Sequence, residues 1–339
     1  METTTDSVPT PGDVFKAFFS YQKTEALRTA IELDLFTAIG AGTSTAKELA
    51  ARCSASERGV RILADYLVVN GFLTKEGSRY ALAPVAAMFL DRSSPACMAS
   101  AIRFVASPVV MEGFQKLTEA VRAGGTAARG DQTEKEHPMW VEFARSMAPL
   151  AGFTARLLAN LLRASAAPGW RVLDVAAGHG LFGITLAQEN PKAEIVALDW
   201  KSVLAVAEEN ARAAGVAGRY STLPGNALEV EYGSGYDLVL LTNILHQFDP
   251  DACGRLLRKV HAALAPAGRA VAVEFVPDET RVRPAEAAEF ALTMLAGTPG
   301  GDAYTFDEYE RMFRKAGFVR SELHDLPPSP QQVLISHRA

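Results

Sequence analysis

The sequence predicts an α/β protein in which a mainly helical N-terminal domain, residues 1–165, precedes a domain built on a mostly parallel sheet, residues 166–339. The chain of 339 residues is long for one compact core. Its first part carries apolar residues at helical spacing, whereas strand-like and helix-like segments alternate after Pro168-Gly169. The last two strand-like segments are joined by Pro-Pro-Ser-Pro, which leaves no room for a helix and predicts an antiparallel hairpin.

The first domain is expected to contain three helices and a hairpin, in that order. The four segments are residues 24–39, 45–52, 56–70 and 72–82. This order is typical of a winged helix, which raises a DNA-binding regulator as one hypothesis. The third helix carries only Arg58 and Arg61 near its start, with Asp65 on the same helix, so little positive charge is available for DNA.

Further helices are predicted at residues 99–121 and 139–162, with a Gly-rich and charged surface loop at residues 124–137 between them. Beyond them, strands and helices alternate, which indicates a parallel sheet wrapped by helices. The alternating segments are residues 171–175, 181–188, 194–198, 203–213, 220–223, 237–242, 252–264 and 270–275, before the hairpin of residues 318–326 and 333–337.

Composition narrows the classes of function. A formal net charge of -5 argues against a nucleic-acid partner. The three cysteines, Cys53, Cys97 and Cys253, form no C-x-x-C pair, so neither a disulfide framework nor a zinc site is expected. The N-terminus lacks the pattern of a targeting segment, and no apolar run reaches the roughly 18 residues of a membrane helix. We therefore expect a cytoplasmic protein with no membrane partner.

A glycine-rich turn marks the expected cofactor site. The strand that ends at Val175 runs through Gly178 and Gly180 into a helix, and Asp199 ends the next strand about 20 residues later. Backbone at such a turn can approach a ligand, and a carboxylate at the position of Asp199 can bind ribose hydroxyls. A dinucleotide and S-adenosyl-L-methionine both fit this pattern. Asp174, just ahead of the glycines, would repel a pyrophosphate but suits a sulfonium cation, and the C-terminal hairpin also favours S-adenosyl-L-methionine.

With these residues the C-terminal half resembles the class I S-adenosylmethionine-dependent methyltransferases, which have a Rossmann-like fold. From about residue 15 to residue 337 the chain resembles the O-methyltransferase family, whose winged-helix-like N-terminal domain mediates dimerisation. The resemblance implies a homodimer and a small-molecule acceptor. It also implies a set of cofactor-binding residues, namely Asp174, Ala176, Gly178, Gly180, Asp199, Trp200, Gly225, Asn226, Ala227 and Asn243. The family usually has Asp where this chain has Asn226, and Asn243 has a turn or capping residue as its alternative interpretation.

His246 is the expected general base. It follows the fourth strand of the sheet and precedes a helix, which places it at the carboxyl edge where α/β sites form. In the resembled family this histidine removes the acceptor's proton and is braced by two acids. One acid corresponds to Glu274 at the end of the fifth strand, whereas Ala303 stands at the position of the other, and Gln247 replaces the Asp that follows the histidine. Asp302 and Tyr304 are the neighbouring alternatives to the missing acid.

Large apolar residues occur on the helices that the family folds over its acceptor. We expect Trp140, Met111, Phe290 and Met294 to line the acceptor site, with Phe143 and Met147 beside the cofactor. They indicate a small aromatic or otherwise apolar acceptor, methylated on a hydroxyl or another nucleophile. No metal-ligand cluster is evident. The alternatives are a protein of this fold that binds the cofactor and catalyses a non-methylating reaction, a cofactor-sensing regulator, and an NAD-dependent oxidoreductase.

Overall fold

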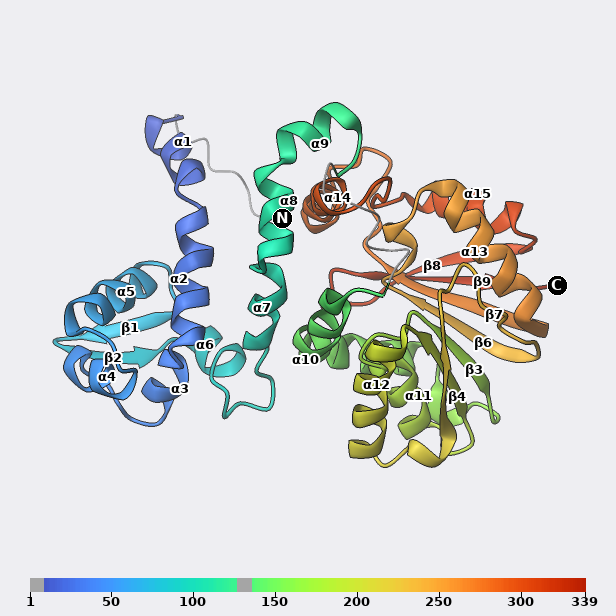
Figure 1. The fold of residues 1–339 in the computed structure, drawn as a ribbon, viewed down its shortest axis with the longest axis horizontal. Helices are drawn as coiled ribbons and strands as arrows, with labels where there is room; N and C mark the ends of the chain where they lie inside the picture. Colours follow the sequence, from blue (N-terminus) through green and yellow to red (C-terminus); the bar gives the residue numbers. More distant parts are fainter. Residues whose placement is uncertain (1–8, 127–135) are drawn as a thin grey trace. The chain divides into compact units, whose positions relative to one another are not determined.

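The computed structural model describes residues 9–126 and 136–339, which form two compact units, the first reaching to Ala106 and the second beginning at Ser107 (Figure 1). The loop predicted at residues 124–137 lies largely outside the described residues. Within the described ranges, no helix has the length and apolar character needed to cross a bilayer.

The first unit is mainly helical and has a two-stranded antiparallel hairpin after α5 (Glu57–Val69). Its elements are α1 (Pro11–Phe18), α2 (Tyr21–Glu32), α3 (Leu35–Gly40), α4 (Ala46–Arg52), α5 (Glu57–Val69), β1 (Leu73–Glu76), β2 (Arg79–Leu82), α6 (Pro84–Phe89), η1 (Ala99–Ala101) and α7 (Ile102–Val105). The predicted order of helices and hairpin is confirmed. The helix predicted at residues 24–39 is two helices, because Asp34 adopts a left-handed backbone with φ 56° between them.

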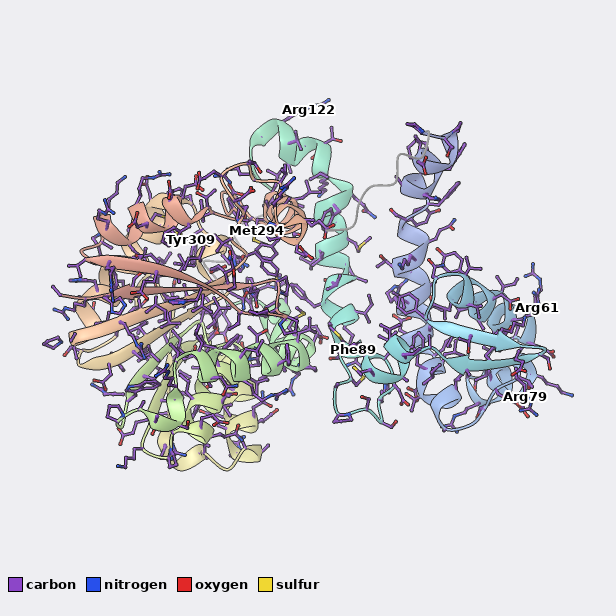
Figure 2. The ribbon with its side chains drawn as sticks, turned by 180° about the vertical axis from the view of Figure 1, so that it is seen from behind. Arg61, Arg79, Phe89, Arg122, Met294 and Tyr309 are labelled. Carbon is purple, nitrogen blue, oxygen red and sulfur yellow. The ribbon has the colours of Figure 1, made fainter. Side chains whose placement is uncertain are left out.

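Side chains fix the start of α4 and the position of the hairpin. Thr45 begins α4 with a reciprocal hydrogen-bonded cap formed with Glu48. Asp65 on α5 accepts hydrogen bonds from Lys75 at 2.6 Å and from the hydroxyl of Tyr80 at 2.7 Å, so it ties both strands of the hairpin to the helix. Asp65 also pairs with Arg61, which Figure 2 shows at one end of this unit.

The second unit is built on a seven-stranded sheet in the order β5-β4-β3-β6-β7-β9-β8. The strands are β3 (Arg171–Val175), β4 (Glu194–Asp199), β5 (Tyr220–Pro224), β6 (Tyr236–Thr242), β7 (Leu264–Glu274), β8 (Arg320–Asp325) and β9 (Gln332–His337). Neighbouring strands are parallel except that β9 is antiparallel to both β7 and β8. The mostly parallel sheet and its antiparallel C-terminal hairpin are therefore confirmed.

Helices cover both faces of the sheet (Figure 1). The helices of the second unit are α8 (Pro108–Gln115), α9 (Leu117–Ala123), α10 (Pro138–Leu161), η2 (Ala164–Ala166), α11 (Leu181–Glu189), α12 (Lys201–Ala213), η3 (Ala217–Arg219), η4 (Leu245–Gln247), α13 (Pro250–Ala263), α14 (Ala285–Gly297) and α15 (Phe306–Lys315), of which α8 and α9 pack on α14. The helical stretch predicted at residues 99–121 is interrupted, because Ser107 and Pro108 begin a new helix, with the Ser107 hydroxyl accepting from Val110 N–H.

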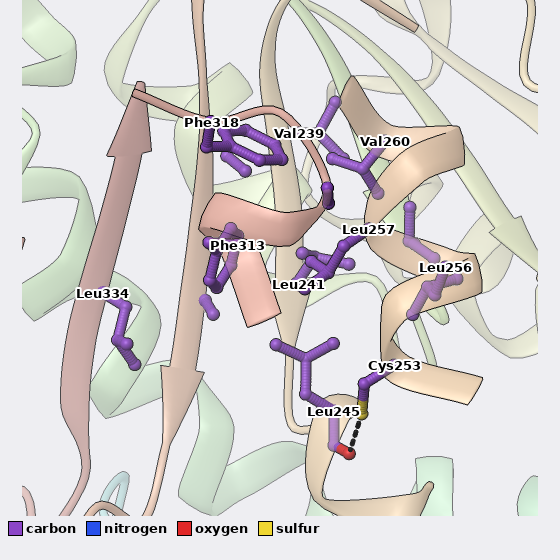
Figure 3. Close-up of a cluster of buried hydrophobic side chains, with 14 of the residues drawn as sticks. Val239, Leu241, Leu245, Cys253, Leu256, Leu257, Val260, Phe313, Phe318 and Leu334 are labelled. Atoms are coloured by element: carbon purple, nitrogen blue, oxygen red, sulfur yellow. Dashed lines mark hydrogen bonds between the residues drawn. The ribbon is translucent and has the colours of Figure 1, made fainter. Parts of the chain in front are cut away.

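Two apolar clusters hold the sheet between its helices. One fills the face covered by α10 and α11. The other lies under α13 and α15, where Leu256, Leu257 and Val260 meet Phe313 and other side chains (Figure 3). Because α10 packs on α11 and α12, and α8 packs on α14, these helices belong to the second unit. The domain division predicted between residues 165 and 166 falls inside this unit, and as a functional division it stays a prediction.

Candidate active site

The carboxyl ends of the parallel strands meet at one edge of the sheet, and the strand order reverses between β3 and β6. Such a reversal is where open α/β sheets bind ligands. The segments that leave this edge after Val175, Asp199, Pro224, Thr242 and Glu274 contain most of the residues singled out from the sequence.

The turn after β3 has the backbone of a ligand-binding loop. Ala176, Gly178 and Gly180 have φ values of 54°, 59° and 75°, so three left-handed residues lead into α11. At Gly180 an added Cβ would lie 2.4 Å from the Tyr220 hydroxyl, so no side chain fits there. The turn therefore depends on glycine for both its conformation and its close packing.

Asp199 braces this turn from the end of β4. Its Oδ2 accepts from the N–H of Gly178 at 2.8 Å, and its Oδ1 accepts from the N–H of Trp200 at 2.7 Å. Each carboxylate oxygen has a second lone pair for a ligand. Burial raises the pKa of Asp199 to about 6. Its carbonyl accepts from the N–H of Gly225, which brings the turn after β5 to the same place.

Asp174 is completely buried beneath the glycine turn. Its Oδ2 accepts from the N–H of Gly183 at 3.1 Å, whereas Oδ1 has no hydrogen-bond partner. Burial raises the pKa of Asp174 to about 7, and the nearby charge of Asp199 adds to the shift. The buried hydroxyl of Tyr220 is also unpartnered. Sequence reasoning did not single out Tyr220, because a tyrosine at the start of a strand has the pattern of an ordinary core residue.

Among the described residues, the charges that shift the pKa values of Asp174, Asp199 and the Tyr220 hydroxyl are all negative, with no positive charge beside them. They come from the two aspartates themselves and from Glu136 and Glu208. A site of this kind favours a cationic ligand over an anionic one.

His179 in the same turn is buried, and its Nδ1 accepts from the N–H of Leu181 at 3.1 Å. Burial lowers its pKa to about 4, so the ring is neutral at physiological pH.

The remaining residues expected at the cofactor lie around this turn. Trp140 on α10 and Trp200 pack against the same small cluster of Ala144, Val203 and Val206, which joins α10 to α12. The Phe143 ring lies edge-on to Trp140 with centroids 6.1 Å apart, and Met147 is half-buried one turn further along α10.

The turn after β5 is shaped by its own polar groups. Asn226 Oδ1 accepts from the N–H of Leu228 at 2.9 Å, and the Ala227 carbonyl accepts from the Tyr232 hydroxyl at 2.6 Å. Gly225, ahead of them, has a φ of 154°.

His246 and Glu274 form a buried pair at the ends of neighbouring strands. The exposed fraction is 4% for His246 and 0% for Glu274, and His246 Nδ1 lies 2.5 Å from Glu274 Oε2. Glu274 Oε1 accepts from the N–H groups of Ile244 and Leu245, at 3.1 and 2.9 Å. One carboxylate therefore holds both the imidazole ring and the backbone turn that carries it.

Asn243, the first residue after β6, has a left-handed backbone with φ 59°. Its N–H donates to the Val273 carbonyl, and its side-chain oxygen accepts from Gln331. The turn interpretation of Asn243 thus has a direct structural basis.

Aromatic rings cover the imidazole. The ring of Phe290 lies edge-on to His246 with centroids 4.7 Å apart, and Phe275 stacks on Phe290 at 4.2 Å. Met294, one turn further along α14, is buried (Figure 2). Met111 is half-buried on α8, the helix that packs on α14.

Ala303, at the position where the resembled family has its second acid, is completely buried. Asp302 pairs with Arg281 at 3.2 Å, and the Tyr304 hydroxyl donates to the Phe248 carbonyl at 2.7 Å. Both alternatives to the second acid therefore have partners other than His246. Among the described residues, no group of three or more His, Cys, Asp or Glu side chains is arranged to hold a metal ion.

This fold and this edge of the sheet are compatible with a methyltransferase, and comparisons with known proteins identify that class and the family. Residues 114–319 match the model of the O-methyltransferase domain, and residues 15–92 match that of the O-methyltransferase dimerisation domain. The chain belongs to the O-methyltransferase family.

Individual proteins agree with this assignment. The 3-hydroxy-5-methyl-1-naphthoate 3-O-methyltransferase of Streptomyces sahachiroi is 32% identical over 301 residues, which cover 87% of this chain and 86% of that protein. A crystal structure of a candidate O-methyltransferase from Nostoc punctiforme is 49% identical, with a TM-score of 0.93 over 98% of this chain and 100% of that one. Human N-acetylserotonin methyltransferase, solved with S-adenosylmethionine, shares the fold at 19% identity, with a TM-score of 0.85 over 99% and 100% of the two chains.

Proposed function

We propose that this protein transfers the methyl group of S-adenosyl-L-methionine to a hydroxyl of a small aromatic molecule, with His246 as general base. The buried His246–Glu274 pair carries this proposal, because it places an oriented imidazole at the sheet edge that also holds the glycine turn. The Streptomyces relative, named for a hydroxynaphthoate, supports an aromatic acceptor.

The residues at the glycine turn suit this methyl donor. Asp199 would bind the ribose hydroxyls with its remaining lone pairs, and the backbone from Ala176 to Gly180 would hold the methionine portion. Trp200 would flank the adenine, with Asn226 at its edge. The unpartnered Asp174 Oδ1 and the negative surroundings fit a cation. When bound, S-adenosyl-L-methionine supplies an electrophilic methyl group on a sulfonium.

His246 would remove the proton of the acceptor. A phenol with a pKa of about 10 is mostly neutral at pH 7, so a base is needed to raise its nucleophilicity. A carboxylate at Glu274 only accepts hydrogen bonds, so it would keep the ring proton on Nδ1 and the lone pair on Nε2. Nε2 is then the atom that takes the proton.

The rings and thioethers around His246 would align the acceptor and exclude water. Phe290 lies beside the imidazole with Phe275 stacked on it, and Met294, Met111 and Trp140 would extend this apolar surface. Holding reactants in line supplies about 7–11 kcal/mol of barrier reduction in such reactions. We also propose that the protein is a homodimer formed through its N-terminal region, since residues 15–92 match a dimerisation domain.

The test is a comparison of the wild type with His246→Ala. Labelled methyl donor and a panel of hydroxynaphthoates and other phenols give turnover, and calorimetry gives the affinity for S-adenosylhomocysteine. We expect kcat to fall by about 10²–10⁴-fold with affinity retained. His324→Gln, on the edge strand β8, is the control. Unchanged turnover in His246→Ala would remove this histidine from the mechanism, and an acceptor consumed without label would favour a non-methylating reaction.

A further inference from the structure

The turn between α14 and α15 packs directly on the main chain of His246. A Cβ added to Gly301 would lie 2.2 Å from the carbonyl oxygen of His246 and 3.0 Å from the carbonyl carbon of Gln247. Real Cβ atoms do not approach other atoms this closely, so a side chain at position 301 requires one of the two segments to move. The Gly301 N–H donates to the Thr298 hydroxyl at 2.8 Å, which fixes the turn in this conformation.

The turn is also held by the segment after α9. The Thr298 carbonyl accepts from the N–H of Thr126 at 2.8 Å. A Cβ on Gly125 would lie 2.1 Å from the Pro299 carbonyl oxygen, so the main chain of this segment packs closely on the turn. Tyr304 links the turn to the histidine segment as well, because its hydroxyl lies within hydrogen-bond distance of both the Phe248 and the Gly300 carbonyls. Added volume at position 301 would therefore displace the backbone of His246.

The segment that carries His246 is also held by Glu274 and Cys253. Glu274 accepts the N–H groups that precede His246 and binds its ring, and the Cys253 thiol donates to the Leu245 carbonyl at 3.1 Å (Figure 3). The backbone of His246 is thus held between these contacts and Gly301. A push on its carbonyl would rotate the peptide and swing the ring relative to Glu274 and Phe290.

From these contacts we infer that Gly301 is a positioning residue for the reaction, whose lack of a side chain sets the main-chain position of His246 and hence the direction of its Nε2. The inference rests on the proposed role of His246 as the base. Gly301 packs on the main chain of His246 and Gln247, so it acts through the segment that carries the base.

Three glycines of this segment form a graded series of substitutions. Gly301→Ala places a methyl group against the His246 carbonyl. Gly300→Ala is milder, since its Cβ would lie 3.2 Å from the Cβ of Asp249. Gly297→Ala is the matched control, because Gly297 is exposed and an added Cβ meets nothing within 4 Å.

The measurements are methyl-transfer kinetics, affinity for S-adenosylhomocysteine, and the proton NMR signal of the His246 Nδ1–H, which we expect downfield because this group would donate to the Glu274 carboxylate. For Gly301→Ala we expect kcat to fall by about 100-fold, the size of effect that a 1 Å misplacement produces. The affinity for S-adenosylhomocysteine should not change, and the downfield signal should move or disappear. Gly300→Ala should show the same changes to a smaller extent, and Gly297→Ala should match the wild type.

A downfield signal and a kcat that stay at wild-type values in folded Gly301→Ala would overturn the inference, as would an equal loss in Gly297→Ala. If Gly301→Ala does not fold, an unchanged signal in Gly300→Ala is the overturning result. The proton signal requires no turnover, so it tests the positioning role separately. A wild-type protein that binds neither S-adenosylmethionine nor S-adenosylhomocysteine would count against the proposed function instead.

Discussion

Glu274 holds both the ring of His246 and the backbone turn that carries it. Its Oε2 lies 2.5 Å from the imidazole Nδ1, and its Oε1 accepts two backbone N–H groups of the segment that leads into the histidine. Both side chains are buried, so bulk water does not compete with the hydrogen bond between them. The pair therefore fixes the tautomer and the orientation of the ring together.

Replacing this carboxylate by an amide should reverse the polarity of the pair. In Glu274→Gln the amide oxygen can still accept from Ile244 and Leu245, which leaves the NH₂ group facing Nδ1. Nδ1 must then accept, so the ring proton moves to Nε2 and the base is lost. We expect kcat to fall by about 10²–10⁴-fold while the affinity for S-adenosylhomocysteine is retained, measured by labelled methyl transfer and calorimetry.

Glu289→Gln, on the exposed side of α14, is the control and should keep wild-type kinetics. A Glu274→Gln protein with undiminished kcat would show that the imidazole needs no carboxylate, and the proposed role of Glu274 would be wrong.

The two buried aspartates predict how stability varies with pH. Burial raises the pKa of Asp174 from 3.8 to about 7 and that of Asp199 from 3.8 to about 6. Between the unfolded and folded pKa values the native state binds protons that the unfolded chain has lost, so the free energy of unfolding falls as pH rises through this window. A pKa raised from 3.8 to about 7 at Asp174 corresponds to about 4 kcal/mol.

Between pH 6 and 7 both aspartates are losing their protons, and Asp174 accounts for about half of that loss. Asp174→Asn should therefore flatten the pH dependence of unfolding in that interval and be more stable than the wild type at pH 8. Urea unfolding at a series of pH values measures both effects, with the exposed Asp307→Asn as control. A slope between pH 6 and 7 that Asp174→Asn leaves intact would mean that another group holds the proton.

The sequence could indicate the His246–Glu274 pair because both residues follow neighbouring strands of a parallel sheet. Neighbouring parallel strands end at the same edge of the sheet, so the residues that follow them lie close together. The glycine turn was predictable for the same reason, since Gly178 and Asp199 also follow adjacent strands.

Contacts between segments without such a register could not be predicted. The packing of Gly301 on His246 depends on where the connection from α14 to α15 crosses the sheet edge. The pairing of Asp302 with Arg281 likewise depends on a bend of the chain between β7 and α14. The break at Asp34 could not be predicted, because apolar residues continue at helical spacing on both sides of it and nothing in that spacing reveals the left-handed residue.

A pair of tyrosines offers a direct test of hydrogen bonding in the core. The Tyr309 hydroxyl is buried without a partner, whereas the Tyr304 hydroxyl, whose ring lies edge-on to Tyr309 at 5.6 Å, donates to the Phe248 carbonyl. Tyr309→Phe should leave the free energy of unfolding unchanged or raise it, because an unpaired buried hydroxyl costs about 1–3 kcal/mol. Tyr304→Phe should lower it by about 1 kcal/mol. Urea unfolding measures both, and a loss in Tyr309→Phe as large as that in Tyr304→Phe would reveal a partner for the Tyr309 hydroxyl, such as an ordered water.

The apolar residues of α1 carry the last prediction. Phe15, Phe18 and Phe19 have exposed fractions of 55%, 66% and 50%, and α1 buries none of its own residues. Three exposed aromatic rings on one short segment indicate a surface that another chain covers, and the dimerisation domain model includes them. Phe15→Asp combined with Phe18→Asp should therefore convert the proposed dimer into a monomer, measured by size exclusion with light scattering. The stability of the monomer should be preserved, because no core contact is lost. Val319→Asp, an equally exposed apolar site in the second unit at 63%, should leave the dimer intact. A double variant that remains dimeric would mean that the dimer forms through another surface.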